Sequence, residues 1–160
     1  MKVKLDTADK VSEVISIAFI LSSVCLVCFS LPKLPDVVPI HFNLSGQPDG
    51  YGSKYTLIVV SLIALPIYAL MTYLSLHPKF YEYRMNKNMP LEEQYKMSSK
   101  MARSIKLVLM PLFFAITFFM LKSAKEKSIG TAEMIWLSLF IPLIFSVIIY
   151  WIVKWEKKFS

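Results

Sequence analysis

Four long blocks of apolar residues, none of which contains a charged side chain, divide the 160-residue chain. They hold 18, 22, 15 and 20 residues and span Val14–Leu31, Tyr55–Leu76, Leu107–Leu121 and Met134–Val153. A helix needs about 20 mainly apolar residues to cross the hydrocarbon core of a bilayer. Lys106 and Lys122 flank the shorter third block, and their apolar stems allow both charges to reach the membrane interfaces. The pattern predicts an all-α integral membrane protein with four transmembrane helices.

The first block differs from a cleavable signal peptide, whose apolar core usually runs about 7–15 residues after a basic segment. Here the block is longer, and Asp6, Asp9 and Glu13 precede it. The bulky residues Val24 and Val27 precede Cys25 and Cys28, where a lipoprotein cleavage site has a small residue. We therefore expect this block to be a retained span.

Lysine and arginine residues are unequally divided between the two sides that four spans define. Thirteen of the 18 lie in the N-terminal tail, the segment 77–106 and the C-terminal tail, and five lie in the other two loops. Cytoplasmic loops carry the excess of positive charge in membrane proteins. We therefore expect both termini and segment 77–106 in the cytoplasm of a bacterium, and the loop 32–54 outside its plasma membrane.

The net charge of +7 fits a protein that contacts a lipid bilayer. Basic residues near a membrane attract anionic headgroups, at about 1 kcal/mol each. Nucleic-acid binding would require a basic face with aromatic or fold-level support, and the sequence contains neither. The expected partner of these charges is lipid, and no nucleic acid is expected.

The chain is predicted to form a single domain over residues 1–160. Residues 11–76 would form a helix pair around the loop 32–54, and residues 107–154 would form a second pair. Within segment 77–106, Pro90 suits the start of a helix. Apolar residues then recur near helical spacing, opposite Lys96, Lys100 and Arg103. We expect an amphipathic helix on the inner membrane face; a helix that docks a partner protein is the alternative.

The interiors of the spans carry prolines but no glycine. Pro66, Pro111 and Pro142 lie within the last three blocks, where kinks could open a cavity of the kind that transporters use, although kinks are also ordinary in membrane bundles. Packing of the GxxxG type is excluded, so packing must rely on Ser, Ala and shape. The absence of charged residues from the blocks argues against a proton or ion pump.

The two cysteines form a C-x-x-C pair, Cys25 and Cys28, near the outer end of the first block. Four-span enzymes that pass electrons from thiols to quinone place such a pair similarly, but they generally relay through a second pair. A thiol in an apolar helix is mostly protonated and inert, so the pair is more readily explained as small apolar filler. No hydrolase, metalloprotease or nucleotide-binding motif occurs. We expect no enzymatic activity and no cofactor.

The loop 32–54 contains three of the four glycines of the chain. Ile40, Phe42 and Leu44 alternate with His41, Asn43 and Ser45, which is the period of a strand and predicts one polar face. The turn sequences Ser45–Pro48 and Pro48–Gly50 follow. Ser53 is placed to cap the second span. These features predict an ordered plate between the first two spans.

The loop resembles the signature of a bacterial membrane domain of unknown function that forms the N-terminal part of SdpI-type immunity proteins. The matching positions are Leu34, Pro35, Asp36, Val38, Pro39, His41, Phe42, Gly46, Pro48, Asp49, Tyr51, Ser53 and Lys54. The resemblance covers Val11 to Leu76. It implies a protein that protects a cell from its own secreted peptide toxin and holds a transcriptional repressor at the membrane. This chain is much shorter than those proteins.

Two interpretations of the loop residues remain open. His41, Asn43 and Asp49 could hydrogen-bond to each other and to the backbone, and so hold a plug over the bundle; alternatively, they present a surface to a peptide or lipid. Zinc bound by His41 with Asp36 or Asp49 lacks enough well-spaced ligands, so no metal is expected. The residues expected to bind the ligand or organise the loop are Asp36, Pro39, His41, Phe42, Asn43, Gly46, Asp49, Tyr51, Ser53 and Lys54.

The working hypothesis is a non-enzymatic immunity, stress-response or signalling protein whose outer loop recognises an amphiphilic ligand such as a toxin peptide or a lipid. The first alternative is a thiol–quinone oxidoreductase that uses Cys25 and Cys28. The second is an accessory subunit of a transporter, which would have a membrane protein partner.

Overall fold

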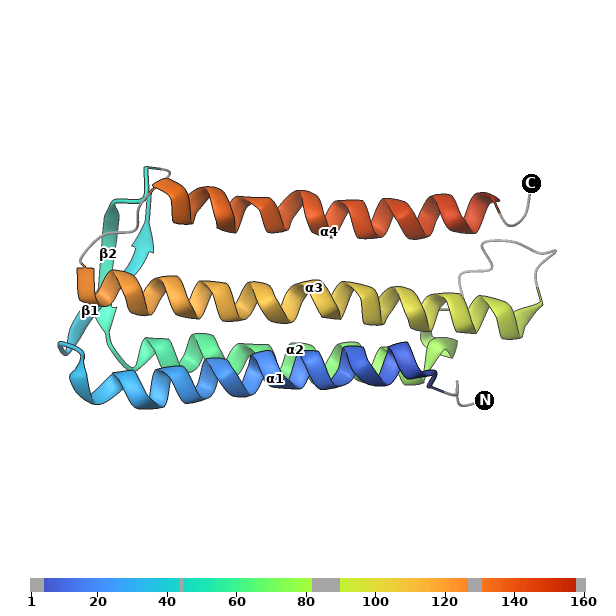
Figure 1. The fold of residues 1–160 in the computed structure, drawn as a ribbon, viewed down its shortest axis with the longest axis horizontal. Coiled ribbons are helices and arrows are strands. Elements are labelled where there is room, and N and C mark those ends of the chain that lie inside the picture. Colours follow the sequence, from blue (N-terminus) through green and yellow to red (C-terminus); the bar gives the residue numbers. More distant parts are fainter. Residues whose placement is uncertain (1–4, 44, 82–89, 127–130, 158–160) are drawn as a thin grey trace.

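The computed structural model describes residues 5–43, 45–81, 90–126 and 131–157, and it is mostly helical (Figure 1). In chain order the elements are α1 (Thr7–Ser30), the 3-10 helix η1 (Leu31–Lys33), β1 (Val37–Phe42), β2 (Pro48–Ser53), α2 (Thr56–Leu76), the 3-10 helix η2 (Pro78–Tyr81), α3 (Leu91–Glu126) and α4 (Thr131–Lys157). Four of the described helices are long and apolar enough to cross a membrane. The prediction of four spans in a multi-pass membrane protein is therefore confirmed, and the loop after the first span adds a two-stranded sheet.

The four long helices lie side by side, with α3 between α4 and the pair formed by α1 and α2 (Figure 1). The β-hairpin β1–β2 lies at one end of this bundle, which we call the hairpin end. The start of α1, the start of α3 and the end of α4 lie at the other end, which we call the terminal end. An even number of spans brings both termini to the same end, and the first connection to the opposite end.

Helix α1 begins where the sequence offers a reciprocal cap. The Asp6 carboxylate accepts a hydrogen bond from the Asp9 amide at 2.8 Å, and the Asp9 carboxylate accepts one from the Asp6 amide at 3.0 Å. These contacts satisfy backbone donors that the first helical turn leaves without partners. The helix therefore starts before the apolar block, and its first turns carry charged side chains.

Small side chains occupy the closest contacts between the helices. Ser16, Ser23, Ser61, Ala64 and Thr117 are almost completely buried. The hydroxyls donate to backbone carbonyls three or four residues earlier, so each buried oxygen is satisfied within its own helix. Packing through serine and alanine agrees with the expectation from the sequence. Pro66, Pro111 and Pro142 all lie inside continuous helices.

The segment that leads into the third span differs from the expectation. Leu91–Glu126 is one continuous helix, in which Tyr95 and Arg103 are buried and Leu91 is exposed. The sequence predicted an apolar face on the membrane and Lys96, Lys100 and Arg103 in water. Lys96 and Lys100 are exposed, but Arg103 is not. Arg103 faces inward because acidic residues of α1 lie opposite it, so the first turns of α3 are part of the bundle. Residues 88–89, which precede the predicted helix start at Pro90, lie outside the described residues.

Candidate functional site

The hairpin at the hairpin end is an antiparallel pair in which Val37 lies opposite Ser53 and Pro39 opposite Tyr51. Residues that lie directly opposite each other point to the same face of a sheet. These four residues therefore share one face. The register shifts on both sides of His41, which interrupts the regular alternation. The predicted polar row of His41, Asn43 and Ser45 is consequently broken, and β1 ends at Phe42.

Asn43 organises the turn of the hairpin. Its side-chain oxygen accepts hydrogen bonds from the amides of Ser45 at 2.9 Å and Gln47 at 3.0 Å. Its backbone amide donates to the Gln47 carbonyl, and its carbonyl accepts from the Gly46 amide. Gly46 has φ 77°, a conformation that residues with a Cβ resist. Asn43 and the signature residue Gly46 therefore define the turn.

The base of the hairpin is anchored to the helices. Leu34 and Val38 are buried in one apolar cluster with Val27 of α1, Leu57 of α2 and Leu121 of α3. Burial of this kind contributes about 1.5–3 kcal/mol for each large aliphatic side chain. Because three helices contribute to the cluster, the hairpin has a fixed position on the end of the bundle.

Lys54 adds a polar clamp to the same base. Its ammonium lies 3.0 Å from the Asp36 carboxylate and donates to the Leu34 carbonyl at 3.4 Å. The Lys54 amide also donates to the Asp36 carbonyl at 2.9 Å. The two ends of the loop are thus tied together directly where it joins the helices.

Two glycines allow the strands to approach closely. A Cβ on Gly50 would lie 2.9 Å from the His41 Cβ, and a Cβ on Gly52 would lie 2.7 Å from Ile40 Cδ1. Both distances are shorter than carbon atoms tolerate, so the glycines make room for β1. Together with Gly46 in the turn, this explains why glycine is concentrated in this loop.

His41 and Asp49 form the polar pair of the hairpin. The His41 Nδ1 lies 2.5 Å from an Asp49 carboxylate oxygen, and both side chains are open to solvent. Exposure screens such a pair, so it contributes at most about 1 kcal/mol. No group of three or more His, Cys, Asp or Glu side chains that could hold a metal ion occurs in the described ranges. His41 and Asp49 therefore provide an exposed hydrogen-bonding pair on the hairpin.

The face that carries Val37 and Tyr51 is open except at Pro39. Val37 is 62% exposed and Tyr51 is 60% exposed, and Tyr55 just beyond β2 is equally open. Phe42 is half-buried and Pro39 is buried.

The prediction that Ser53 caps α2 is wrong. The Ser53 hydroxyl accepts a hydrogen bond from the Tyr55 amide at 3.3 Å, but the residue at the cap position of α2 is Tyr55, whose side chain makes no cap hydrogen bond. Helix α2 begins at Thr56, two residues later than a cap at Ser53 would require.

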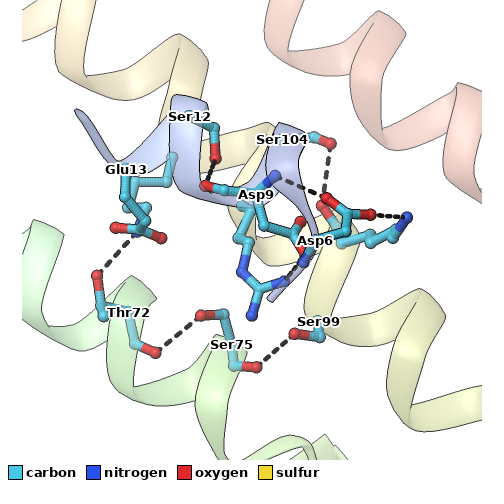
Figure 2. Close-up of polar contacts among 11 residues, drawn as sticks. Asp6, Asp9, Ser12, Glu13, Thr72, Ser75, Ser99 and Ser104 are labelled. Atoms are coloured by element: carbon cyan, nitrogen blue, oxygen red, sulfur yellow. Dashed lines mark hydrogen bonds and ion pairs between the residues drawn. The ribbon is translucent and has the colours of Figure 1, made fainter. Parts of the chain in front are cut away.

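A second polar site lies inside the bundle at the terminal end. Three acidic residues of α1 face three basic residues of α3 across the helix contact, and we call this set the charge ladder (Figure 2). Its pairs are Asp6–Lys100, Asp9–Arg103 and Glu13–Lys106. The acids are three and four residues apart and the bases three apart, so each set follows one helix face. This spacing was the signal in the sequence that could have revealed the ladder.

Lys106 is the most buried member of the charge ladder, with a side-chain exposure of 0%. Its ammonium donates to both Glu13 carboxylate oxygens, at 2.5 and 2.6 Å, and to the Thr72 hydroxyl at 2.8 Å. It also lies 4.5 Å from the centre of the Tyr68 ring, whose hydroxyl donates to Glu13. The expectation that Lys106 reaches the membrane interface is wrong, because α1 and α2 both supply partners for its charge within the bundle.

Hydrogen bonds extend from the ladder along the contact between α2 and α3. The Ser99 hydroxyl donates to the Ser75 carbonyl, and the Ser75 hydroxyl donates to the Thr72 carbonyl (Figure 2). Thr72 in turn accepts from Lys106. The terminal ends of α1, α2 and α3 are therefore joined by polar contacts, whereas their hairpin ends are joined by apolar ones.

Asp6 lies at the exposed edge of the ladder. Its hydrogen bond from the Lys100 ammonium, followed by that from the Asp9 amide, lowers the pKa of the Asp6 carboxyl below its usual 3.8. A lowered pKa means that the ionised form is favoured in the folded protein. The stabilisation is complete above the ordinary pKa and is lost as the pH falls through the lowered value.

Cys25 and Cys28 are free and exposed on the surface of α1. In a bilayer this surface faces lipid.

Comparison with known protein families finds one match, and it covers the hairpin and parts of the two helices that flank it. Residues 18–65 match the family model described as "Domain of unknown function (DUF1648)". This part of the chain is a DUF1648 domain. The DUF1648 domain includes the second half of α1, the whole hairpin and the first half of α2. Comparisons of the chain with curated proteins and with solved structures found no match.

Proposed function

We propose that this protein is a non-enzymatic bacterial membrane protein that recognises an amphiphilic ligand, such as a toxin peptide or a lipid, on its hairpin. The observation that carries the proposal is the open apolar and aromatic face of Val37 and Tyr51 on an otherwise anchored hairpin. Isolated two-stranded hairpins are marginally stable in water. This one is fixed by its buried base, so binding would not have to order it first.

The chemistry of the hairpin suits an amphiphile. The exposed valine and tyrosines provide contacts for apolar groups, and tyrosine also offers a hydroxyl. His41 and Asp49 provide a donor and an acceptor close to this face, and both are exposed. A peptide with alternating apolar and polar groups, or a lipid headgroup with its first methylenes, has matching features.

The proposed orientation places the hairpin outside the cell and both termini in the cytoplasm. It is supported by the excess of Lys and Arg in the tails and in segment 77–106. In this orientation the hairpin meets secreted molecules before they reach the bilayer. The resemblance of the loop to SdpI-type immunity proteins is consistent with protection against such a molecule.

The proposal is tested by photo-crosslinking in living cells. A photoreactive amino acid replaces Tyr51 on the hairpin, and the matched control replaces Tyr150, which is 56% exposed on α4. We expect Tyr51 to give a crosslink to a separate peptide or lipid that the Tyr150 probe does not give. Crosslinks from Tyr51 only within the chain would reject the recognition surface and favour a structural plug.

A second test concerns protection. Cells that carry Tyr51→Ser or Val37→Ser should become more sensitive to membrane-active peptides than cells with the unaltered protein, at equal protein levels. Both residues are exposed, so the substitutions should leave the fold intact. Unchanged sensitivity in a strain that lacks the protein altogether would contradict the immunity role.

A further inference from the structure

A cleft of about 220 Å³ opens between α1, α3 and α4 at the terminal end of the bundle. Its polar part is lined by Asp9 and Ser12 of α1 and by Lys100, Arg103 and Ser104 of α3, and its apolar part by Ala8, Leu107 and Trp151. The helix segments that line the cleft lie at the opposite end of the bundle from the hairpin (Figure 1). It is therefore separate from the proposed recognition surface.

Arg103 has charge compensation in this cleft but lacks hydrogen bonds. Its side chain is 3% exposed, and its Nη1 lies 2.8 Å from a carboxylate oxygen of Asp9. The N–H groups do not point at that oxygen, so none of the three guanidinium nitrogens has a hydrogen-bond partner within the described part of the chain. The same Asp9 oxygen instead accepts from the Asp6 amide. Apart from this ion pair, the donors of a buried cation are thus left without acceptors.

A buried donor without a partner is costly, and buried polar groups in proteins almost always have one. The missing partner must present several acceptor oxygens to a planar guanidinium. A phosphate group does this, because two of its oxygens match two parallel N–H groups of arginine. Lys100 provides a second cation in the same cleft. We propose that the cleft binds a phosphate group, carried either by a membrane phospholipid or by free phosphate.

The surroundings of Arg103 suit a phospholipid. Leu107 and Trp151 continue the cleft from its charged part along the helices, as acyl chains would follow a headgroup. Tryptophan is enriched where the hydrocarbon core meets the headgroups. Lys154, one turn after Trp151, lies 4.9 Å from the Trp151 ring and adds positive charge nearby.

The test uses native mass spectrometry of the purified full-length protein with phosphatidylglycerol, and with diacylglycerol of the same acyl chains as the phosphate-free control. We expect phosphatidylglycerol to bind, and Arg103→Gln to weaken that binding at least ten-fold without changing retention of diacylglycerol. The control variant Lys96→Gln removes a basic residue of the same helix that is exposed and paired with Glu92. It should bind phosphatidylglycerol as the unaltered protein does.

Inorganic phosphate distinguishes the two sources. If millimolar phosphate protects the protein against unfolding in an Arg103-dependent way and displaces the lipid, free phosphate is the ligand; if it does neither, the lipid is. Ser104→Leu fills the half-buried wall without removing a charge, and should also abolish binding. Because Ser104→Leu keeps the charge ladder, it still tests whether the cleft binds a phosphate group if Arg103→Gln does not fold. Equal binding of phosphatidylglycerol and phosphate by the unaltered protein, Arg103→Gln and Ser104→Leu would overturn the proposal.

Discussion

The charge of Lys106 is tolerated because its partners surround it. Glu13 supplies the opposite charge, Thr72 supplies a hydroxyl, and Tyr68 supplies both a ring face and a hydrogen bond to Glu13. Removing charges from water is expensive, and their attraction compensates for this only when the geometry is good and other groups complete the hydrogen bonds. The ladder meets both conditions at this position.

We predict that Lys106→Met strongly destabilises the protein, because it leaves the Glu13 carboxylate without its cation. The expected loss is about 3–5 kcal/mol in the free energy of unfolding. The double variant Lys106→Met with Glu13→Gln should recover a large part of it, since no unpaired charge remains. Reversible unfolding by denaturing detergent in mixed micelles measures both values.

Lys96→Met is the matched control for this prediction, because Lys96 lies on the same helix in an exposed pair with Glu92. Exposed pairs of this kind contribute about 0.2–1 kcal/mol. An effect of Lys106→Met as small as that of Lys96→Met would show that the burial of the Glu13–Lys106 pair does not matter for stability.

A second prediction at this scale compares two neighbouring glycines. A Cβ at Gly52 meets the flexible end of Ile40, which can move aside, whereas a Cβ at Gly50 meets the Cβ of His41 next to the backbone. Gly50→Ala should therefore cost about 1–3 kcal/mol and Gly52→Ala less than about 1 kcal/mol. Hydrogen exchange of the strand amides in the two variants provides the measurement. An equal or reversed order would contradict the observed packing of β1 on β2.

At the scale of single elements, the sequence predicted the helices more completely than their contacts. The four spans follow from uncharged blocks, because the cost of burying charge in hydrocarbon acts on each helix separately. The hairpin was anticipated in part: the turn at residues 45–48 follows from local signals such as Gly46. The turn predicted at residues 48–50 is wrong, because β2 begins at Pro48. The bulge at His41 depends on how β1 fits β2, and period-2 alternation contains no information about it.

Helix α3 shows where prediction from one segment fails. Lys96, Lys100 and Arg103 give this segment an amphipathic pattern, from which the charged face was assigned to water. The acids that pair with them lie 93 or more residues earlier, on α1. Only the joint spacing of the two sets indicates that both faces are internal, so periodicity within one helix could not reveal it. The cleft at Arg103 was missed for the same reason.

The hairpin should open as a unit when its turn is weakened. Asn43→Ala removes the acceptor of two amides, those of Ser45 and Gln47, and each lost hydrogen bond costs about 0.5–1.5 kcal/mol. We expect faster hydrogen exchange across β1 and β2 and little change in the helices, because the cluster at Leu34 and Val38 remains. Asn43→Asp keeps the acceptor and should exchange as slowly as the unaltered protein. Faster exchange throughout the helices of Asn43→Ala would contradict a locally organised turn.

On the scale of the whole molecule, the two ends of the bundle are built differently. At the hairpin end, α1, α2 and α3 meet in an apolar cluster that also holds the hairpin. At the terminal end they meet in the charge ladder. Helix α4 packs along α3, and many of its large apolar side chains are exposed, as expected for a surface covered by lipid. The asymmetry is consistent with one end that presents a surface and another that contacts the headgroup layer.

The proposed orientation predicts which single cysteines can be labelled from outside the cell. In a variant with Cys25→Ser and Cys28→Ser, which removes two exposed thiols on α1, a single cysteine replaces Tyr51 on the hairpin or Glu92 on α3. Both positions are exposed, and they lie at opposite ends of the bundle. Because the Lys and Arg distribution favours a cytoplasmic terminal end, we expect a membrane-impermeant maleimide to label Tyr51→Cys in intact cells whose outer layers are permeable to it. It should label Glu92→Cys only after the plasma membrane is opened. The reverse pattern would place the hairpin in the cytoplasm, where it cannot meet a secreted toxin, and would leave the cleft at Arg103 to face the outer leaflet.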